Sequence, residues 1–205
     1  MIRFLIFLLA SPFLHSEEVA LFPSNSLDEW TSTGRAQWTY QDGILSGGQD
    51  GDPKRSGLLL SKAQFQDFDL SLEFKIDEHG KYNSGLYLRY QPEQKGDRLQ
   101  VNIGRGVADE PVGLYLNDWL DKGDAKDEHR KPREWNTLRI KALGPHIQVW
   151  LNGQKIVDYQ DPKRLAKHLA PGHLAFQTYG AEDHAGWVKF RKLKIQPTTQ
   201  SSSPE

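Results

Sequence analysis

Cysteine is absent from the 205 residues of the chain, and its absence excludes two arrangements. There is no disulfide framework, and there is no cysteine to carry a lipid anchor. Positive charge is not in excess either, because 26 Lys and Arg residues face 27 Asp and Glu residues. No basic stripe stands out, so neither nucleic acid nor an anionic membrane surface is indicated as a partner.

Cofactor motifs are also missing. Gly104-Arg105-Gly106 follows a predicted strand but precedes no helix, so it does not form a dinucleotide-binding turn, and no phosphate-loop pattern occurs. The sequence gives no sign of haem or flavin. The spacings of histidines and acids match no recognised metal motif, although ligands distant in the sequence could still assemble a divalent metal site. We therefore expect no cofactor and name no metal ligands.

Long apolar runs are confined to the N-terminus. Met1 to Leu14 hold Arg3 and then an almost unbroken apolar stretch, which is too short for a membrane span and is followed by Ser16 and two glutamates. This pattern predicts a signal peptide at residues 1–16, no membrane span after its removal, and export to the periplasm or the cell exterior. Leu14 occupies the third position before the predicted cleavage site, where a small residue is usual. An uncleaved anchor is therefore the alternative.

The rest of the chain suits a single domain. About 190 residues can bury most of their apolar surface without cross-links. We predict one domain at residues 17–196 and a disordered tail at residues 197–205, where Pro, Thr, Ser and Gln predominate. Nothing in the sequence indicates an oligomeric state.

Alternation of apolar and polar residues dominates this domain. Residues 68–76 place five apolar side chains on one face, which is typical of a half-buried antiparallel strand. Asn152-Gly153 predicts a tight hairpin, the phase change near Arg191-Lys192 predicts a β-bulge, and residues 161–171 suit one short helix. Many strands and almost no helix predict an all-β fold, a two-sheet antiparallel β-sandwich.

Polar and aromatic side chains follow a second pattern in the predicted strands, where they alternate with Leu, Val, Ile and Phe. In one sheet they would form a floor of amides, guanidinium groups and phenols, which hydrogen-bond hydroxyl-rich ligands and stack on sugar rings. We expect this floor on the concave sheet, with a carbohydrate as its ligand. The side chains are Asn83, Tyr87, Arg89, Arg98, Gln100, Asn102, Tyr115, Gln177 and Tyr179.

Several of these side chains have a structural alternative. Arg89 offers a donor fork for clustered ligand oxygens, or it pairs with an acid such as Glu73. Gln100 and Gln177 donate to sugar hydroxyls or cross-link neighbouring strands. Asn83 contacts a ligand or forms an Asx turn at the start of its strand, and the turn is favoured.

Trp119 belongs to a polar insertion, residues 117–133, that is longer than a typical loop. Such an insertion is either the rim of a functional site or a solvated flexible loop. As part of a rim, Trp119 would stack on a pyranose ring together with Tyr115 and Tyr179.

Histidine and acidic side chains are both candidates for proton transfer, and the sequence does not choose between them. Histidine titrates nearest to neutral pH, and His184 and His129 both lie in predicted loops, where an ordinary surface histidine is the commoner case. Glu73 and Asp118 are the acidic candidates. We take His184, His129 and Glu73 as candidate catalytic residues.

The chain resembles the 3-keto-disaccharide hydrolase domain family through nearly all of residues 17–196. No single motif is specific, but their order is. The matching stretches are Leu27-Asp28-Glu29-Trp30, Asp42-Gly43-Ile44-Leu45, residues 65–70, Asn83-Ser84-Gly85 with Arg89, Gly113-Leu114-Tyr115, Glu134-Trp135-Asn136, Trp150-Leu151-Asn152-Gly153, Gln177 and Phe190-Arg191.

The resemblance implies a concanavalin A-like jelly roll and cleavage of glycosides already oxidised to a ketone at C3. The ketone acidifies the hydrogen at C2, so the site needs a base, an acid and a group that holds the enolate oxygen.

One position departs from the family. Relatives commonly carry a glutamate where this chain has Arg98, a change that inverts the local charge. A non-catalytic carbohydrate-binding module on the same sandwich is therefore the alternative function, and a structural module of the cell envelope is a third.

Overall fold

The computed structural model describes residues 17–49, 56–77, 83–93, 96, 98–104, 110–163, 166–179 and 186–198. The predicted signal peptide and His184 lie outside these ranges. The elements are β1 (Val19–Ala20), β2 (Trp30–Gly34), β3 (Gln37–Gln41), β4 (Ile44–Gln49), β5 (Gly57–Phe65), β6 (Phe68–Ile76), β7 (Asn83–Tyr90), β8 (Gln100–Asn102), β9 (Gly113–Tyr115), β10 (Trp119–Asp121), β11 (Asn136–Leu143), β12 (His146–Leu151), β13 (Gln154–Gln160), α1 (Ala166–Leu169), β14 (Gly172–Tyr179) and β15 (Gly186–Pro197).

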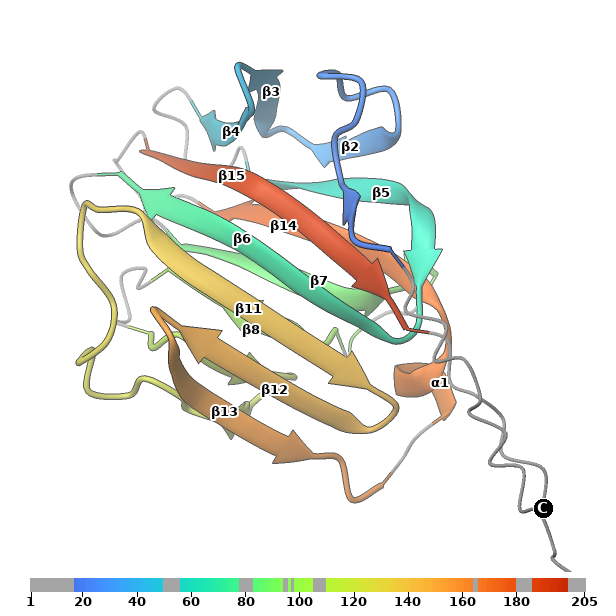
Figure 1. Cartoon of the computed structure of the whole chain (residues 1–205), viewed down its shortest axis with the longest axis vertical. Coiled ribbons are helices and arrows are strands. Elements are labelled where there is room, and N and C mark those ends of the chain that lie inside the picture. The colour runs from blue at the N-terminus through green and yellow to red at the C-terminus, as the bar shows by residue number, and fades with distance from the viewer. Residues whose placement is uncertain are drawn as a thin grey trace, which may run out of the picture.

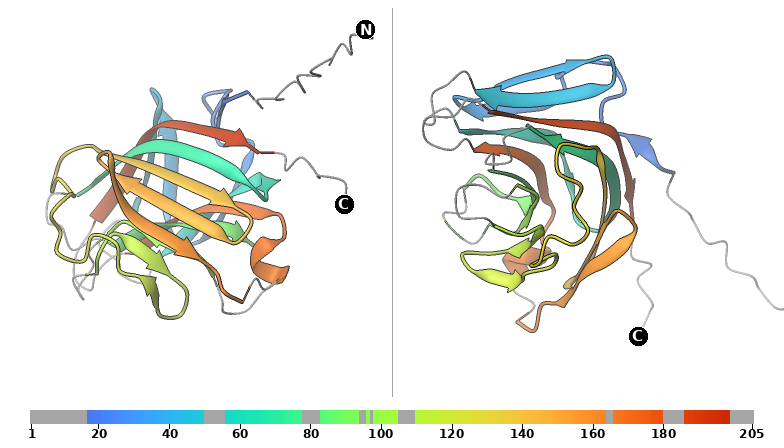
Figure 2. Two further views of the ribbon diagram at one scale, coloured as in Figure 1. Left: turned by 60° about the horizontal axis from the view of Figure 1, so that its bottom comes forward. Right: turned by 90° about the vertical axis from the view of Figure 1, so that its left-hand side faces the viewer.

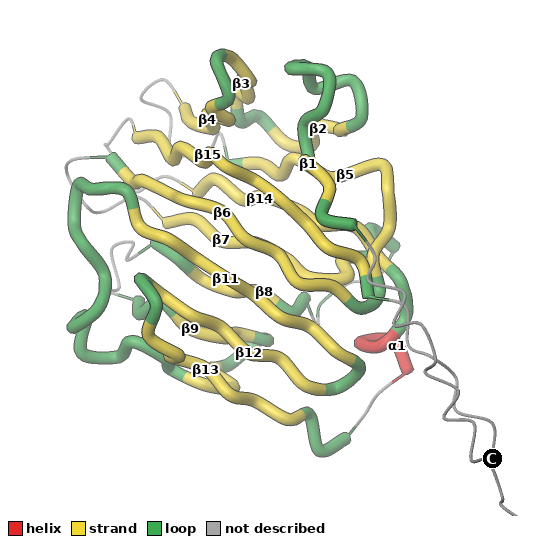
Figure 3. Tube along the Cα trace, in the orientation of Figure 1, coloured by secondary structure: helices red, strands yellow, loops and turns green. Residues whose placement is uncertain are grey.

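The strands form two antiparallel sheets that pack face to face (Figures 1 and 2). Within the described residues, an eight-stranded sheet has the order β13-β12-β11-β6-β15-β4-β3, with β1 beside β15. A seven-stranded sheet has the order β10-β9-β8-β7-β14-β5-β2. Figure 3 shows strands nearly throughout, with α1 as a single short helix in the described part of the chain. The predicted all-β sandwich with one short helix is confirmed.

The core lies between the sheets, where the apolar faces meet. In β6 every second residue from Phe68 to Ile76 is buried, as the alternation predicts. Phe176 of β14 and Phe190 of β15 are both fully buried, with ring centroids 4.7 Å apart across the two sheets. Burying one such side chain stabilises the fold by roughly 1.5–3 kcal/mol. Contacts of this kind therefore determine which face of each strand is turned toward the core.

Local turn chemistry sets the register at the predicted places. Asn152 and Gly153 both have positive φ, as the tight turn between β12 and β13 requires. The predicted bulge also occurs, because the register of β15 against β6 shifts between Arg191 and Lys194, and Lys192 has positive φ.

The C-terminal strand is longer than expected. β15 continues to Pro197, and the backbone N–H of Thr198 donates to the carbonyl oxygen of Asp67 at 2.8 Å. Pro197 and Thr198 are therefore held against the sandwich, and the domain bounds at residues 17–196 stay a prediction. Among the described residues, no helix is long and apolar enough to cross a membrane.

Candidate functional site

A solvent-open hollow of about 710 Å³ lies on the outer face of the seven-stranded sheet. We call it the polar hollow. The structure brings eight of the ten predicted ligand-binding residues to it, from β7, β8, β9, β10 and β14. These residues are Asn83, Tyr87, Gln100, Asn102, Tyr115, Trp119, Gln177 and Tyr179.

Strand register builds the floor of the polar hollow. Gly85 of β7 pairs with Gln177 of β14 on one side and with Asn102 of β8 on the other. A Cβ atom on Gly85 would lie 2.0 Å from Nε2 of Gln100, so only glycine leaves room for this side chain to lie across β7. The Gln100 amide then donates to Oε1 of Gln177 at 2.6 Å. Gln100 and Gln177 are thus cross-linked to each other while both line the hollow.

A carboxylate that the sequence analysis overlooked also lies in the polar hollow. Asn102 donates to the carbonyl oxygens of Gly104 and Pro111, both at 2.8 Å, and so clamps both ends of the connection between β8 and β9. This clamp brings Glu110 to the floor, where Asn83 Nδ2 donates to its Oε2 at 2.9 Å. Asn83 Oδ1 is buried without a hydrogen-bond partner.

Burial raises the pKa of Glu110 above its ordinary value of 4.5, because desolvation disfavours the charged carboxylate. Burial likewise raises the pKa of Tyr87, with a smaller opposing effect of the charge on Arg98. A carboxyl group with a raised pKa in an open hollow is suited to proton transfer.

The far wall of the polar hollow comes from the β9–β10 hairpin. The rings of Tyr115 and Trp119 meet edge to face at 5.3 Å and leave aromatic surface toward the hollow. Asp118 also lines the hollow, but its Oδ1 accepts from the backbone N–H of Trp119. Among the described residues lining the hollow, Lys122 is the only one that carries a positive charge.

The polar insertion is an ordered rim. The buried Asp124 carboxylate accepts backbone N–H groups from Glu128, His129 and Arg130 at 2.9–3.3 Å. At its far end, Asn152 Nδ2 donates to the carbonyl oxygen of His129 at 2.7 Å. The insertion therefore connects the wall of the hollow to the eight-stranded sheet.

Arg89 does not face the polar hollow, contrary to the predicted strand phase. A bulge intervenes, because Tyr87 pairs with Ala175 and Tyr90 with His173, and Arg89 takes a positive φ of 52°. Its guanidinium is turned into the protein and donates to Asp67 Oδ1 and to the carbonyl oxygens of Gln66, Gly144 and His168. The structural alternative is the right one, with Asp67 rather than Glu73 as the partner.

Three further predicted residues also lie away from the polar hollow. Arg98 is exposed and stacks over the Tyr90 ring at 5.2 Å. Glu73 points outward from β6 in the opposite sheet, where Arg191 and Lys192 bind its two oxygens at 2.6 and 2.7 Å. His129 belongs to the ordered insertion but does not line the hollow.

An apolar cluster next to the polar hollow was not expected from the sequence. Leu60, Tyr90 and Ala175 are buried on the outer face of the seven-stranded sheet, with Leu58 and Tyr87 packed against them. The run Leu58-Leu59-Leu60 was the available signal, since its first and third residues share a face. In the described part of the chain, no group of three or more His, Asp or Glu side chains could hold a metal ion.

A sandwich whose outer sheet face carries amides, phenols, an indole and a carboxyl group has the side chains that bind a carbohydrate. More specifically, the chain belongs to the 3-keto-alpha-glucoside-1,2-lyase-like domain family, whose model matches residues 17–196. This match confirms the resemblance seen in the sequence motifs. The family makes the chain a hydrolase-like member of the glycoside-cleaving enzymes.

Known proteins agree with this assignment. A 3-keto-disaccharide hydrolase from Bacteroides thetaiotaomicron is 22% identical in an alignment that covers 87% of this chain and 77% of that protein. A candidate glycosyl hydrolase from Parabacteroides distasonis superposes with a TM-score of 0.65 and 18% identity over 89% of this chain and 94% of that one. A Bacillus subtilis protein of unknown function with a galectin-like fold superposes with a TM-score of 0.67 and 12% identity. The superposition covers 88% of this chain and 94% of that one. The two solved structures show the fold.

Proposed function

We propose that the chain is an exported enzyme that cleaves 3-keto-glycosides in the polar hollow, with Glu110 as the proton-transfer residue. The observation that carries the proposal is the Glu110 carboxyl group, which has a raised pKa, is held by Asn83 and lies on a floor of amide and phenol side chains. Glu110 is preferred to His129 and Glu73, which lie away from the polar hollow, whereas His184 lies outside the described residues and stays a prediction.

The reaction begins at C2 of the oxidised sugar. The Glu110 carboxylate takes the C2 proton, and the electron pair moves onto the C3 ketone to form an enolate. Collapse of the enolate breaks the C1–oxygen bond. The leaving oxygen takes the proton from protonated Glu110, which restores the carboxylate, and departs as the hydroxyl group of the aglycone. Water then adds to the unsaturated ketone and completes hydrolysis. The Lys122 ammonium group is the cation in the hollow that can stabilise the enolate oxygen.

The sugar ring is held by the other groups of the hollow. The Gln100–Gln177 pair presents amide groups fixed by their mutual hydrogen bond, so little rotamer freedom is lost on binding. Tyr115 and Trp119 supply the aromatic wall for the apolar face of a pyranose ring.

The proposed function is tested by product release. The purified chain is incubated with a 3-keto-disaccharide and, in parallel, with the unoxidised disaccharide, and monosaccharide release is followed. Release from the keto sugar alone is expected, because only the ketone acidifies C2. Saturable binding without release would instead identify a carbohydrate-binding module, and cleavage of both sugars would contradict the enolate route.

Gly85→Ala is expected to raise KM for the keto sugar about three- to tenfold, the equivalent of one lost hydrogen bond, with little change in kcat. The new methyl group would displace the Gln100 amide from Gln177. Steady-state kinetics measure the effect, and Gln100→Ala is the matched variant. Because both changes remove the same interaction, the double variant should lose no more than Gln100→Ala alone. Additive losses would show that Gly85 acts in another way.

A further inference from the structure

Positive charge gathers on the outer face of the eight-stranded sheet, where β15, β6 and β11 lie side by side in the centre (Figure 1). Among the side chains of these three strands that are not buried, seven are Lys or Arg and only two, Asp69 and Glu73, are acidic. We call this region the basic face. It is strongly positive in a chain whose overall formal charge is −1, even though Glu18, from outside these strands, pairs with Lys194. Its cations are Lys75, Arg139, Lys141, Lys189, Arg191, Lys192 and Lys194.

The basic face is assembled by the fold and not by a run of sequence, because its cations come from strands far apart along the chain. The bulge in β15 adds one cation, since it turns the consecutive residues Arg191 and Lys192 both outward, where each binds Glu73. Strand register then aligns the cations in rows. Lys194 of β15 and Arg139 of β11, for example, flank the same position of β6.

The two arginines of the basic face are held in fixed positions. Arg139 donates to both carboxylate oxygens of Asp69 and lies over the Trp150 ring at 5.0 Å. Arg191, bound to its acid as described above, lies over the Trp135 ring at 4.0 Å. The Arg139 side chain is still 52% exposed. A guanidinium fork held in this way loses little rotamer freedom when it binds a further carboxylate.

Two lysines of the basic face lie in an unfavourable arrangement. Lys75 of β6 and Lys189 of β15 are directly opposite each other in the register. Like charges at opposite positions destabilise an antiparallel pair. Among the residues that the structure describes, neither lysine has an ion-pair partner, and Lys189 contacts only the Trp187 ring, at 4.8 Å. An anionic group bound between the two ammonium groups would remove the repulsion.

A depression of about 550 Å³ lies within the basic face. Arg139, Lys192 and Lys194 line it together with the Trp150 indole, so cations from two strands and an aromatic ring share one concave surface. An indole packs against the apolar side of a sugar ring, and the neighbouring cations bind an acid group on that sugar. The depression therefore suits an acidic sugar better than a small inorganic anion.

The chemistry of the face also separates it from other surfaces that bind polyanions. A protein that inserts into a membrane surface presents large apolar side chains beside its basic ones. Among the described residues, the exposed large hydrophobic side chains are Val19 and Tyr179, and neither belongs to β6, β11 or β15. The carbohydrate-active family and the proposed export favour an acidic glycan over nucleic acid.

We propose that the basic face binds a linear polysaccharide that carries a carboxylate group on each sugar. Neighbouring cations lie about 5–7 Å apart, as set by the strand separation and the two-residue period, and the carboxylates of such a chain repeat at comparable intervals. The bound glycan would hold the protein while the polar hollow, on the other sheet, stays open. The inference does not depend on the proposed reaction, because the two surfaces share no residue.

The test compares polygalacturonate with its methyl ester, which has the same backbone but no charge. Affinities of the full chain are measured by isothermal titration calorimetry at low ionic strength. Polygalacturonate is expected to bind at least about tenfold more tightly than the ester, and its affinity should fall as salt is added. Equal affinities, or no binding of polygalacturonate, would overturn the proposal.

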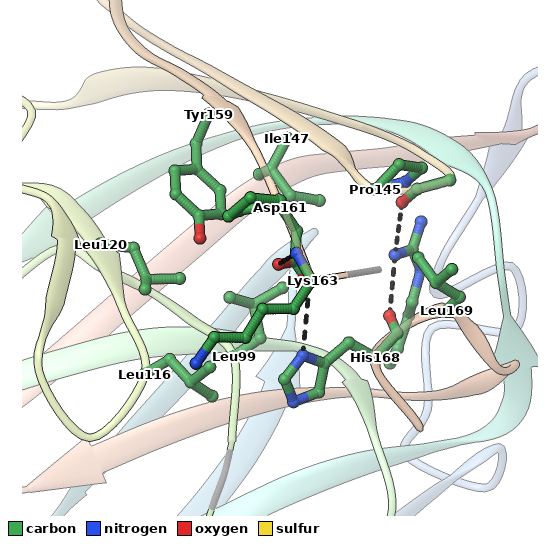
Figure 4. Close-up of a pocket in the computed structure, with 13 residues that line it drawn as sticks. Leu99, Leu116, Leu120, Pro145, Ile147, Tyr159, Asp161, Lys163, His168 and Leu169 are labelled. Carbon is green, nitrogen blue, oxygen red and sulfur yellow. Dashed lines mark hydrogen bonds and ion pairs between the residues drawn. The ribbon is translucent and has the colours of Figure 1, made fainter. Parts of the chain in front are cut away.

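A pair of double variants locates the binding. Lys75→Gln/Lys189→Gln removes the opposed lysines and should bind polygalacturonate about three- to tenfold more weakly than the parent chain. Lys62→Gln/Lys163→Gln removes the same charge elsewhere, because Lys62 belongs to β5 and Lys163 lines a separate cavity of about 290 Å³ beside α1 (Figure 4). This control should keep the parent affinity. Equal losses in the two variants would show a response to net charge alone and contradict the assignment.

Folding and the class of partner are checked by two further measurements. Lys75→Gln alone relieves the repulsion, so its Tm should equal or exceed that of the parent chain although it binds polygalacturonate more weakly. A lower Tm would contradict the opposed-lysine argument. Single-stranded DNA and vesicles that contain an anionic lipid should both bind more weakly than polygalacturonate. Tighter binding of either would overturn the choice of an acidic polysaccharide as the partner.

Discussion

Replacing Glu110 with glutamine is expected to lower kcat/KM for a 3-keto-disaccharide by roughly 10²–10⁴-fold, the usual contribution of a positioned general base. Glutamine keeps the shape of the side chain and an oxygen that accepts from Asn83 Nδ2, but it cannot take a proton. Because substrate contacts remain, the loss should be in kcat. Steady-state kinetics on the keto sugar measure it.

The pH dependence follows from the direction of the pKa shift. Burial raises the pKa of Glu110 above 4.5, and the base must be ionised to act. The acid limb of the kcat/KM profile should therefore fall at a pH above 4.5, with activity rising as the carboxyl group loses its proton. A limb at or below pH 4.5 would exclude Glu110 as the group that titrates.

Glu110→Gln should lower the activity without lowering the thermal stability of the chain. A carboxyl group whose pKa is higher in the folded state favours folding below its unfolded pKa, and this contribution is lost as pH rises through the folded pKa. Ionised Glu110 therefore opposes folding at neutral pH, and Glu110→Gln should have a Tm equal to or above that of the parent chain at pH 7. A large fall in Tm would mean that the variant loses activity through misfolding.

Glu73→Gln is the matched control for Glu110→Gln. Glu73 faces outward from the opposite sheet and pairs with Arg191 and Lys192. Its removal should leave kcat/KM unchanged and cost about 1 kcal/mol, because both cations keep contact with solvent, at 35% and 65% exposure. Equal losses of activity in the two variants would contradict the placement of the chemistry in the polar hollow.

The part of the site predicted from the sequence is the part governed by strand alternation. Gln100 and Asn102 in β8, and Gln177 and Tyr179 in β14, keep their period of two, so their shared face could be inferred without coordinates. The family motif Asn83-Ser84-Gly85 also gains physical content. Asn83 holds Glu110, the Ser84 hydroxyl donates to the Gln177 carbonyl oxygen, and Gly85 makes room for Gln100.

The positions of two residues, Glu110 and Arg89, could not be predicted from the alternation. Glu110 lies in a connection with no periodicity, and its position depends on backbone contacts made by Asn102. Arg89 follows a regular strand pattern, but the bulge in β7 turns it from the outer face to the interior. A single residue of this kind reverses the side on which a side chain lies, and the sequence carries no glycine there to signal it.

Arg89→Met should lower the free energy of unfolding by about 3–5 kcal/mol, because it leaves a buried carboxylate without its cation. The side chains of Arg89 and Asp67 are only 2% and 4% exposed. The guanidinium also connects the β5–β6 turn, the β11–β12 turn and α1 through carbonyl groups that methionine cannot reach. Urea unfolding at 25 °C measures the change. At a lower temperature, where Arg89→Met is folded, its KM should equal that of the parent chain.

Arg98→Met is the control for Arg89→Met, because it also replaces an arginine by methionine but leaves the hydrogen bonds of the Arg89 guanidinium intact. Arg98 is exposed, and its contact with the Tyr90 ring is worth about 0.5–1 kcal/mol. Arg89→Lys keeps the charge but not the planar fork, so its stability should lie between those of Arg89→Met and the parent chain. Arg89→Met could instead have the same urea midpoint of unfolding as the parent chain but no longer bind the keto sugar. That result would place Arg89 in the ligand site. The buried ion pair with Asp67 and the bonds to three separate segments favour the structural role.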